Sequence, residues 1–157
     1  MIDLNKIKDF FILDLANNHF GNLGHALDVI DNFGVLINKL KINATIKLQF
    51  RNLDSYIHKS IKSSGSSNKY VERFNSTKLS RSEFETIVKK IQSFKLKTMS
   101  TPFDEDSFSL INDLNIDIIK IASTSANDKS LLKEVKKTNK PCVISVGGKD
   151  IEQIDQI

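Results

Sequence analysis

Ile46-Lys47-Leu48-Gln49-Phe50 is a short segment in which a lysine and a glutamine alternate with apolar residues. A second segment, Ile118-Ile119-Lys120-Ile121-Ala122, also has a lysine in the middle of an apolar run of strand length. Lysine is almost never fully buried without an anion, because removing an ammonium group from water costs several kcal/mol. Two such lysines on neighbouring strands would form a cationic pocket. The sequence therefore predicts a site for a small anion, with phosphate as the first candidate.

Apolar runs and helical patterns alternate along the chain, which is typical of consecutive βα units around a parallel sheet. The predicted strands are 10–16, 45–50, 96–101, 117–122 and 141–146. The predicted helices are 25–41, 81–94, 105–114 and 128–137, and another helix is expected to open after Gly148. Ser82 and Glu85 have the spacing of a capping box near the start of the second helix. The fold class is therefore α/β.

Two architectures fit five βα units without an antiparallel hairpin. One is an open doubly wound sheet, and the other is the first five or so strands of a TIM (β/α)8 barrel, which typically needs about 250 residues. The barrel interpretation implies that 157 residues are an incomplete barrel whose first and fifth strands are unpaired edges. Residues 52–78, rich in Ser, Asn and Lys around Ser63-Ser64-Gly65-Ser66-Ser67, form either a mobile surface loop or a lid over the sheet.

Charge, cysteine content and apolar runs argue against several classes of protein. Lys+Arg 23 against Asp+Glu 19 gives a net charge of +4, but no arginine-rich block is present, so nucleic-acid binding is not favoured. The single Cys142 excludes an internal disulfide, and its place in a predicted strand indicates a core residue. The N-terminus lacks the pattern of a signal peptide, and no apolar run is long enough to cross a membrane. A cytoplasmic protein without a membrane partner is expected.

The polar residues gather at the carboxyl ends of the predicted strands, where parallel α/β folds bind ligands. Each group alone has an ordinary explanation as a helix cap or a turn, but together they offer many donors to an anion. The three histidines, His19, His25 and His58, have no metal-binding spacing, so no metal site is predicted from them. Only His19 is expected near a site. The strand-end groups are Asn17-Asn18-His19, Gln49, Ser100-Thr101, Ser123-Thr124, Ser145 and Gly147-Gly148.

These residues, in this order, resemble the N-terminal barrel of the sialic acid synthase family, which comprises N-acetylneuraminate, legionaminate and pseudaminate synthases. The resemblance runs from about residue 10 to the last residue. It rests on 13–21 (LDLANNHFG), 47–49 (KLQ), 100–105 (STPFDE), 120–123 (KIAS) and 144–147 (ISVG).

The resemblance implies a transferase that condenses phosphoenolpyruvate with an N-acetylated amino sugar, in nonulosonate and cell-surface polysaccharide biosynthesis. It implies that Lys47 and Lys120 hold phosphoenolpyruvate, and that Asp14 faces the sugar or the reacting water as the catalytic carboxylate. The hydroxyls of Thr101, Ser123 and Ser145 would assist the two lysines, and Asn18, His19, Gln49 and Ser125 are possible site-lining residues.

The sequence also departs from the family pattern. The family usually has Glu and Gly at the positions of Asp14 and Ala16, and commonly an acidic catalytic residue at the position of Ser125, so proton transfer is in doubt. Asp128, close by, is expected to cap a helix.

Residues 1–157 correspond to the N-terminal part of the barrel domain. The family's Mn or Mg ion is held by two histidines on later strands, and a C-terminal antifreeze-like domain of the partner subunit in a homodimer grips the sugar. This chain lacks those parts, so alone it is expected to be inactive.

Two other classes stay open on the residues alone. A non-catalytic half-barrel could bind a partner or dimerise through its open edges. An unrelated phosphate-binding enzyme with a doubly wound sheet ranks last, because the sequence has neither GxGxxG nor GxxxxGK[ST].

Overall fold

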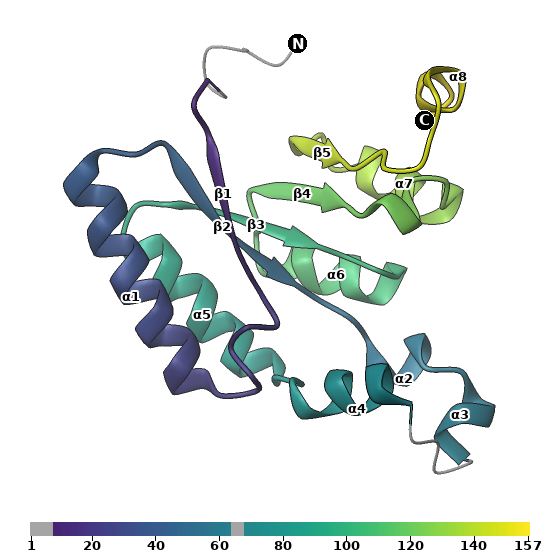
Figure 1. Ribbon diagram of the computed structural model, residues 1–157, viewed down its shortest axis with the longest axis horizontal. Helices are drawn as coiled ribbons and strands as arrows, with labels where there is room; N and C mark the ends of the chain where they lie inside the picture. Colours follow the sequence, from purple (N-terminus) through teal and green to yellow (C-terminus); the bar gives the residue numbers. More distant parts are fainter. Residues whose placement is uncertain (1–7, 64–67) are drawn as a thin grey trace.

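The computed structural model describes residues 8–63 and 68–157. Five parallel strands form one sheet in the order β1-β2-β3-β4-β5 (Figure 1). The observed strands agree with the predicted ones within one residue at almost every end. The exception is β5, predicted to run to residue 146, because the ladder to β4 ends at Ile144. The strands are β1 (Phe11–Ala16), β2 (Ala44–Gln49), β3 (Lys97–Thr101), β4 (Ile118–Ile121) and β5 (Cys142–Ile144).

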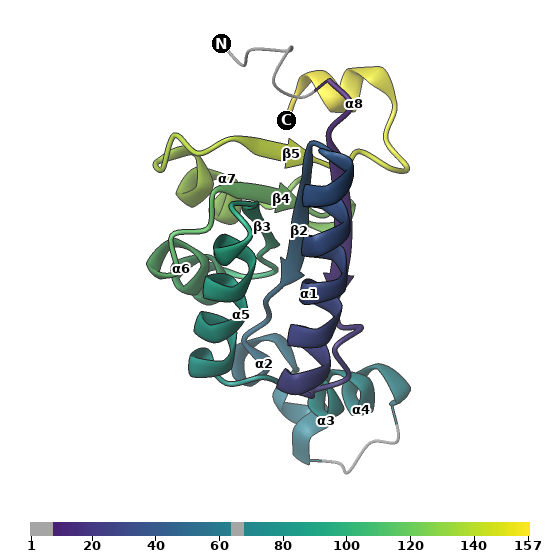
Figure 2. The same cartoon turned by 90° about the vertical axis from the view of Figure 1, so that its left-hand side faces the viewer.

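Every strand pairs with the strand that precedes it in the sequence, so the sheet grows in one direction only. Because βαβ crossovers are right-handed, crossovers that all step the same way place their helices on the same face. Figures 1 and 2 show α1, α5 and α6 along one side of the sheet. A doubly wound sheet reverses its strand order and has helices on both faces. The fold is therefore that of consecutive TIM-barrel units, and the doubly wound alternative is wrong.

The helices between the strands begin where side chains cap them. They are α1 (Leu23–Leu40), α5 (Arg81–Ser93), α6 (Glu105–Asp113) and α7 (Lys129–Lys136), and α8 (Ile151–Asp155) follows β5. Asp128 caps α7 by accepting from the Leu131 amide, as expected. The predicted capping box is two residues out of place: Ser80 and Glu83 form it, because the helix begins at Arg81. Glu85 lies inside the helix and pairs with Arg81 instead.

The two faces of the sheet differ as the alternating pattern predicts. Ile46, Leu48 and Phe50 point into the core under the helices and are at most 2% exposed. Ile119 and Ile121 do the same on β4. Lys47, Gln49 and Lys120 occupy the alternate positions and so belong to the opposite face, called here the open face.

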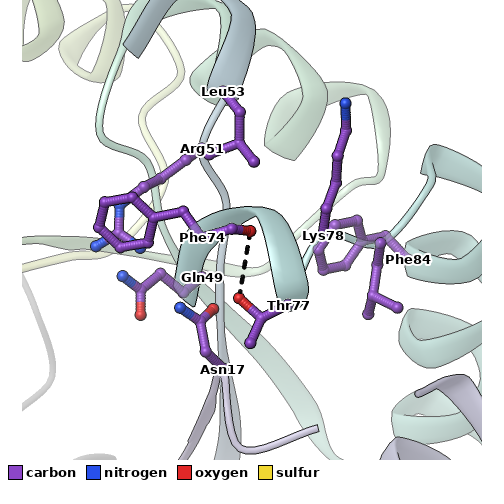
Figure 3. A pocket seen from close by; sticks show the side chains of 9 residues that line it. Asn17, Gln49, Arg51, Leu53, Phe74, Thr77, Lys78 and Phe84 are labelled. Atoms are coloured by element: carbon purple, nitrogen blue, oxygen red, sulfur yellow. Dashed lines mark hydrogen bonds between the residues drawn. The ribbon is translucent and has the colours of Figure 1, made fainter. Parts of the chain in front are cut away.

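The segment from 52 to 78 is not a structureless loop. Its described residues form the short helices α2 (Leu53–Tyr56), α3 (Lys59–Ser63) and α4 (Lys69–Ser76), and the side chains of Asn52 and Asn68 cap the starts of α2 and α4. A pocket between α4 and the ends of β1 and β2 puts this segment beside the strand ends, where the lid interpretation expects it (Figure 3). A Cβ at Gly21 would clash with the carbonyl of Ser76, so the β1–α1 turn touches the end of α4. Residues 64–67 of the serine-glycine stretch lie outside the described residues.

Candidate anion site on the open face

Lys47 lies in the middle of β2, with Asp14 of β1 directly beside it in the sheet register. The Lys47 Nζ is 2.9 Å from Asp14 Oδ2, and the two side chains are 14% and 51% exposed. The shielded lysine therefore has a carboxylate partner from this chain. Because that partner is half exposed, an incoming anion can reach the same ammonium group.

Lys120 lies on the same face of β4 and reaches toward β5. Its Nζ donates to Ser145 Oγ at 2.5 Å and to the Ile121 carbonyl at 2.7 Å. Burial lowers the pKa of Lys120, and repulsion by Lys47 lowers it further, against weaker opposing effects of Cys142 and Asp14. The two ammonium groups thus act on one another, and an anion between them would relieve their repulsion.

Thr101 ends β3, between the strands that carry the two lysines. It pairs with Gln49 in the register, so its side chain belongs to the open face. Thr101 is 3% exposed, and among the described residues its Oγ1 has no hydrogen-bond partner. Buried hydroxyls are nearly always bonded, so this one is suited to donate to a bound ligand.

The predicted serines lie around the ends of β4 and β5. Ser123 opens a 3-10 turn, Ser123–Ser125, and a Cβ at Gly147 would come into contact with it. Ser145 is already bonded to Lys120. Ser125 is 8% exposed within the turn.

Cys142 is only partly buried and packs against the core from outside rather than within it, and burial raises the pKa of its thiol.

The turn after β1 places its polar residues in different surroundings. Asn18 is exposed, and its amide donates to the Asp14 carbonyl at 3.4 Å. His19 is 1% exposed, its Nδ1 accepts from the Gly21 amide at 3.0 Å, and burial lowers its pKa. The charges that act on His19 are Glu83 and His25 rather than the two lysines. A role for His19 in a ligand site therefore stays a prediction.

Ala16 has φ 41°, a left-handed conformation that favours glycine, and it follows a shift in the β1–β2 register. This conformation gives a physical reason for the glycine that the family usually has at this position.

Two features of the site escaped the sequence reasoning. One is the pairing of Asp14 with Lys47, because the register between two strands is not visible in either segment alone. The other is Arg51, which follows β2 after Phe50 and lines the pocket shown in Figure 3 together with Gln49 and Phe74. A charged residue immediately after the predicted strand that carries Lys47 and Gln49 was the available signal.

The described residues contain no group of three or more His, Cys, Asp or Glu side chains that could hold a metal ion. The described residues therefore do not fit the divalent metal implied by the family. Nor does any helix in the described part of the chain have the length and apolar character needed to span a membrane.

Comparison with known proteins gives a consistent result. The model of the NeuB family matches residues 39–157. The uncharacterized protein MJ1065 of Methanocaldococcus jannaschii is 30% identical over 145 residues, which is 92% of this chain and 40% of that protein. The N,N'-diacetyllegionaminic acid synthase of Campylobacter jejuni is 36% identical over 58 residues, which is 37% of this chain and 17% of the synthase.

A solved structure from Chromobacterium violaceum, provisionally named spore coat polysaccharide biosynthesis protein E, superposes with a TM-score of 0.88 at 38% identity. The superposition covers 94% of this chain and 44% of that one. The chain thus spans less than half the length of the relatives it matches.

Proposed function

The chain belongs to the NeuB family, and we propose that it carries the phosphoenolpyruvate-binding part of a nonulosonic acid synthase. In the proposed reaction, phosphoenolpyruvate, water and an N-acetylated amino sugar such as N-acetylmannosamine form a nonulosonic acid and release phosphate. This is a transferase reaction that makes a carbon–carbon bond, and its product would enter cell-surface polysaccharides. The similarity to the Campylobacter jejuni synthase supports this class of reaction.

The observation that carries the proposal is the grouping of Lys47 and Lys120 on the open face with the Thr101 hydroxyl, which has no hydrogen-bond partner in the described part of the chain. Phosphoenolpyruvate has a carboxylate and a phosphate, and charge-assisted hydrogen bonds from lysines are about twice as strong as neutral ones. The two lysines hold the anionic groups, and the hydroxyls of Thr101, Ser123 and Ser145 supply further donors.

Asp14 is the proposed catalytic carboxylate, facing the sugar or the reacting water. Its ion pair with Lys47 holds the carboxylate beside the anion site. Asn18, Gln49 and Ser125 are proposed to line the same region. Ser125 has no carboxylate, so a base acting at that position must come from another residue.

The acceptor sugar, a Mn or Mg ion and a homodimer partner complete the proposed enzyme from outside the described residues. Among the described residues no group of three or more metal-binding side chains occurs, and the 157-residue chain alone is expected to form no keto acid. A cytoplasmic location likewise remains a prediction.

Isothermal titration calorimetry with phosphoenolpyruvate tests the proposal on the 157-residue chain. Lys47→Met and Lys120→Met should each weaken binding about 10- to 100-fold, because each removes a charged hydrogen-bond donor. Lys97→Met is the matched control, since the exposed Lys97 begins β3 at the opposite end of the sheet and carries the same charge. Unchanged affinity in both site variants, or an equal loss in the control, contradicts the proposal. Keto acid formation by the chain alone contradicts the expected inactivity.

A non-catalytic module that pairs with a second copy of this chain is the second candidate function. It is favoured by exposed apolar side chains at the free side of β1, including Phe11 at 56% and Ile12 at 38% exposure. Sedimentation analysis over a range of concentrations distinguishes the two. A dimer that fails to bind phosphoenolpyruvate, and that Phe11→Ser dissociates, supports the module.

A further inference from the structure

Arg51 is held between two aromatic rings from different parts of the chain. Its Cζ is 4.3 Å from the ring centroid of Phe74 on α4 and 4.0 Å from that of Phe103, which follows β3. Figure 3 shows the Arg51 side chain against the Phe74 ring, above Gln49. A planar guanidinium stacks well on such rings, so these contacts fix the plane of the Arg51 side chain and connect α4 to the strand ends.

The same guanidinium meets the side-chain amide of Gln49. With the Gln49 amide oriented so that its oxygen faces Arg51, this oxygen lies 2.7 Å from Arg51 Nη1 and also accepts from Nη2. A guanidinium has only donors, so the amide must turn its oxygen toward Arg51. The amide N–H₂ group then points away from Arg51.

Gln49 stands at the end of β2 beside Thr101, two residues after Lys47 on the same face. It also lines the pocket below α4, which includes Asn17 and Thr77. Its N–H₂ group is thus a donor at the junction between the anion site and this pocket.

We infer that Arg51 is a positioning residue that fixes the Gln49 amide with its N–H groups toward the ligand. The ligand group bound there is consequently a hydrogen-bond acceptor, such as a carbonyl, hydroxyl or carboxylate oxygen. The identity of this ligand as phosphoenolpyruvate or the amino sugar rests on the proposed function, whereas the orientation of the amide does not.

Hydrogen exchange of the arginine side chains, measured by NMR on the 157-residue chain, tests the orientation without a ligand. The Arg51 Nη protons should exchange several-fold more slowly than those of Arg73, an exposed arginine on α4. Gln49→Glu keeps an acceptor and should preserve this protection, whereas Gln49→Met should remove it. Equal exchange at Arg51 in the wild type and in Gln49→Met overturns the inference.

Titration with phosphoenolpyruvate and, separately, N-acetylmannosamine tests the consequence for binding. The ligand that meets Gln49 should shift its side-chain N–H₂ signals. Arg51→Lys keeps the positive charge but removes the paired N–H donors of the guanidinium, so it should weaken binding of that ligand about three- to tenfold. Arg73→Lys should leave the affinity unchanged.

The possible outcomes separate the two proposals. In one outcome, phosphoenolpyruvate binding depends on Lys47 and Lys120, but Arg51→Lys changes the affinity for neither ligand. This result overturns the inference and leaves the proposed function standing. Failure of both ligands to bind the wild type overturns the proposed function and the ligand part of the inference, and the exchange rates still decide the orientation.

Discussion

Ser100 and Thr101 are consecutive residues of β3 that belong to opposite faces of the sheet. Both are buried, at 0% and 3% exposure, and among the described residues neither hydroxyl has a hydrogen-bond partner. Ser100 pairs in the register with Leu48 and Ile119, under the helices. Thr101 pairs with Gln49 on the face that carries the lysines.

The difference shows that an unpaired buried hydroxyl has no fixed meaning. Under the helices, the apolar neighbours of Ser100 offer it nothing to bond, so the group costs stability that the surrounding packing offsets. On the open face, the same chemical group stands beside cations that attract an anion. The surroundings of the hydroxyl, and not its burial alone, indicate a ligand site.

The largest contrast between the faces is expected on β4. Ile119→Ala should lower the free energy of unfolding by about 2–5 kcal/mol, because it leaves a cavity in the core. Lys120→Met should leave the free energy of unfolding unchanged or higher, while it weakens phosphoenolpyruvate binding about 10- to 100-fold. Urea denaturation and calorimetry measure the two effects. A Lys120→Met variant as unstable as Ile119→Ala would show that both faces serve folding.

The pH dependence of phosphoenolpyruvate binding should also arise from a residue of the open face, Lys120. Lys120 has a pKa below its usual 10.5 in the free chain, and a bound anion should raise it. At a pH between the Lys120 pKa of the free chain and that of the complex, binding takes up a proton. Affinity should therefore fall as pH rises, by at most about tenfold per pH unit for one titrating group. Calorimetry at increasing alkaline pH, in buffers of different ionisation enthalpy, measures this uptake. The slope of affinity against pH should be smaller in Lys120→Met. An unchanged slope in this variant would mean that another group takes up the proton.

The two hydroxyls of β3 give a matched pair of substitutions. Thr101→Val should weaken phosphoenolpyruvate binding about three- to tenfold without loss of stability, since it removes a donor that is proposed to bond only to the ligand. Ser100→Ala should leave affinity unchanged and stability equal or slightly higher. Equal affinities for the two variants would remove the functional distinction between the faces.

The smallest effect is expected from Asp14. Asp14→Asn removes the carboxylate that competes for Lys47, so inorganic phosphate should bind roughly two- to threefold more tightly at low salt. The gain should shrink at high salt, where ions screen a half-exposed pair. Weaker phosphate binding in this variant would instead mean that Asp14 orients Lys47 for the anion.

Most of the fold could be predicted because it follows local periodicity. Alternation in 46–50 assigned Lys47 to one face and Leu48 to the other, and the structure confirms this. The helices between 52 and 78 were missed because each is short and polar, with few apolar positions to reveal a period. The capping box was misplaced because Ser80 and Ser82 are both followed three residues later by Glu.

The individual residues of the candidate site could be proposed from the sequence, but the contacts between them could not. The strand-end pattern identified Lys47, Lys120 and Thr101 as candidates, and their roles remain predictions. The Asp14–Lys47 pair depends on strand register, and the Arg51 stack brings together rings from residues 74 and 103. Such contacts between distant segments leave no local signal in either one.

The one-directional strand order also has a consequence for synthesis. Each of β2 to β5 pairs with the strand made just before it, so each can join the sheet as soon as it leaves the ribosome. Domains generally fold from the N-terminus during translation, and short separations between pairing segments favour rapid folding. The sheet can therefore be built unit by unit in the order of translation, and Lys47 is in place on its strand before Lys120 has been synthesised.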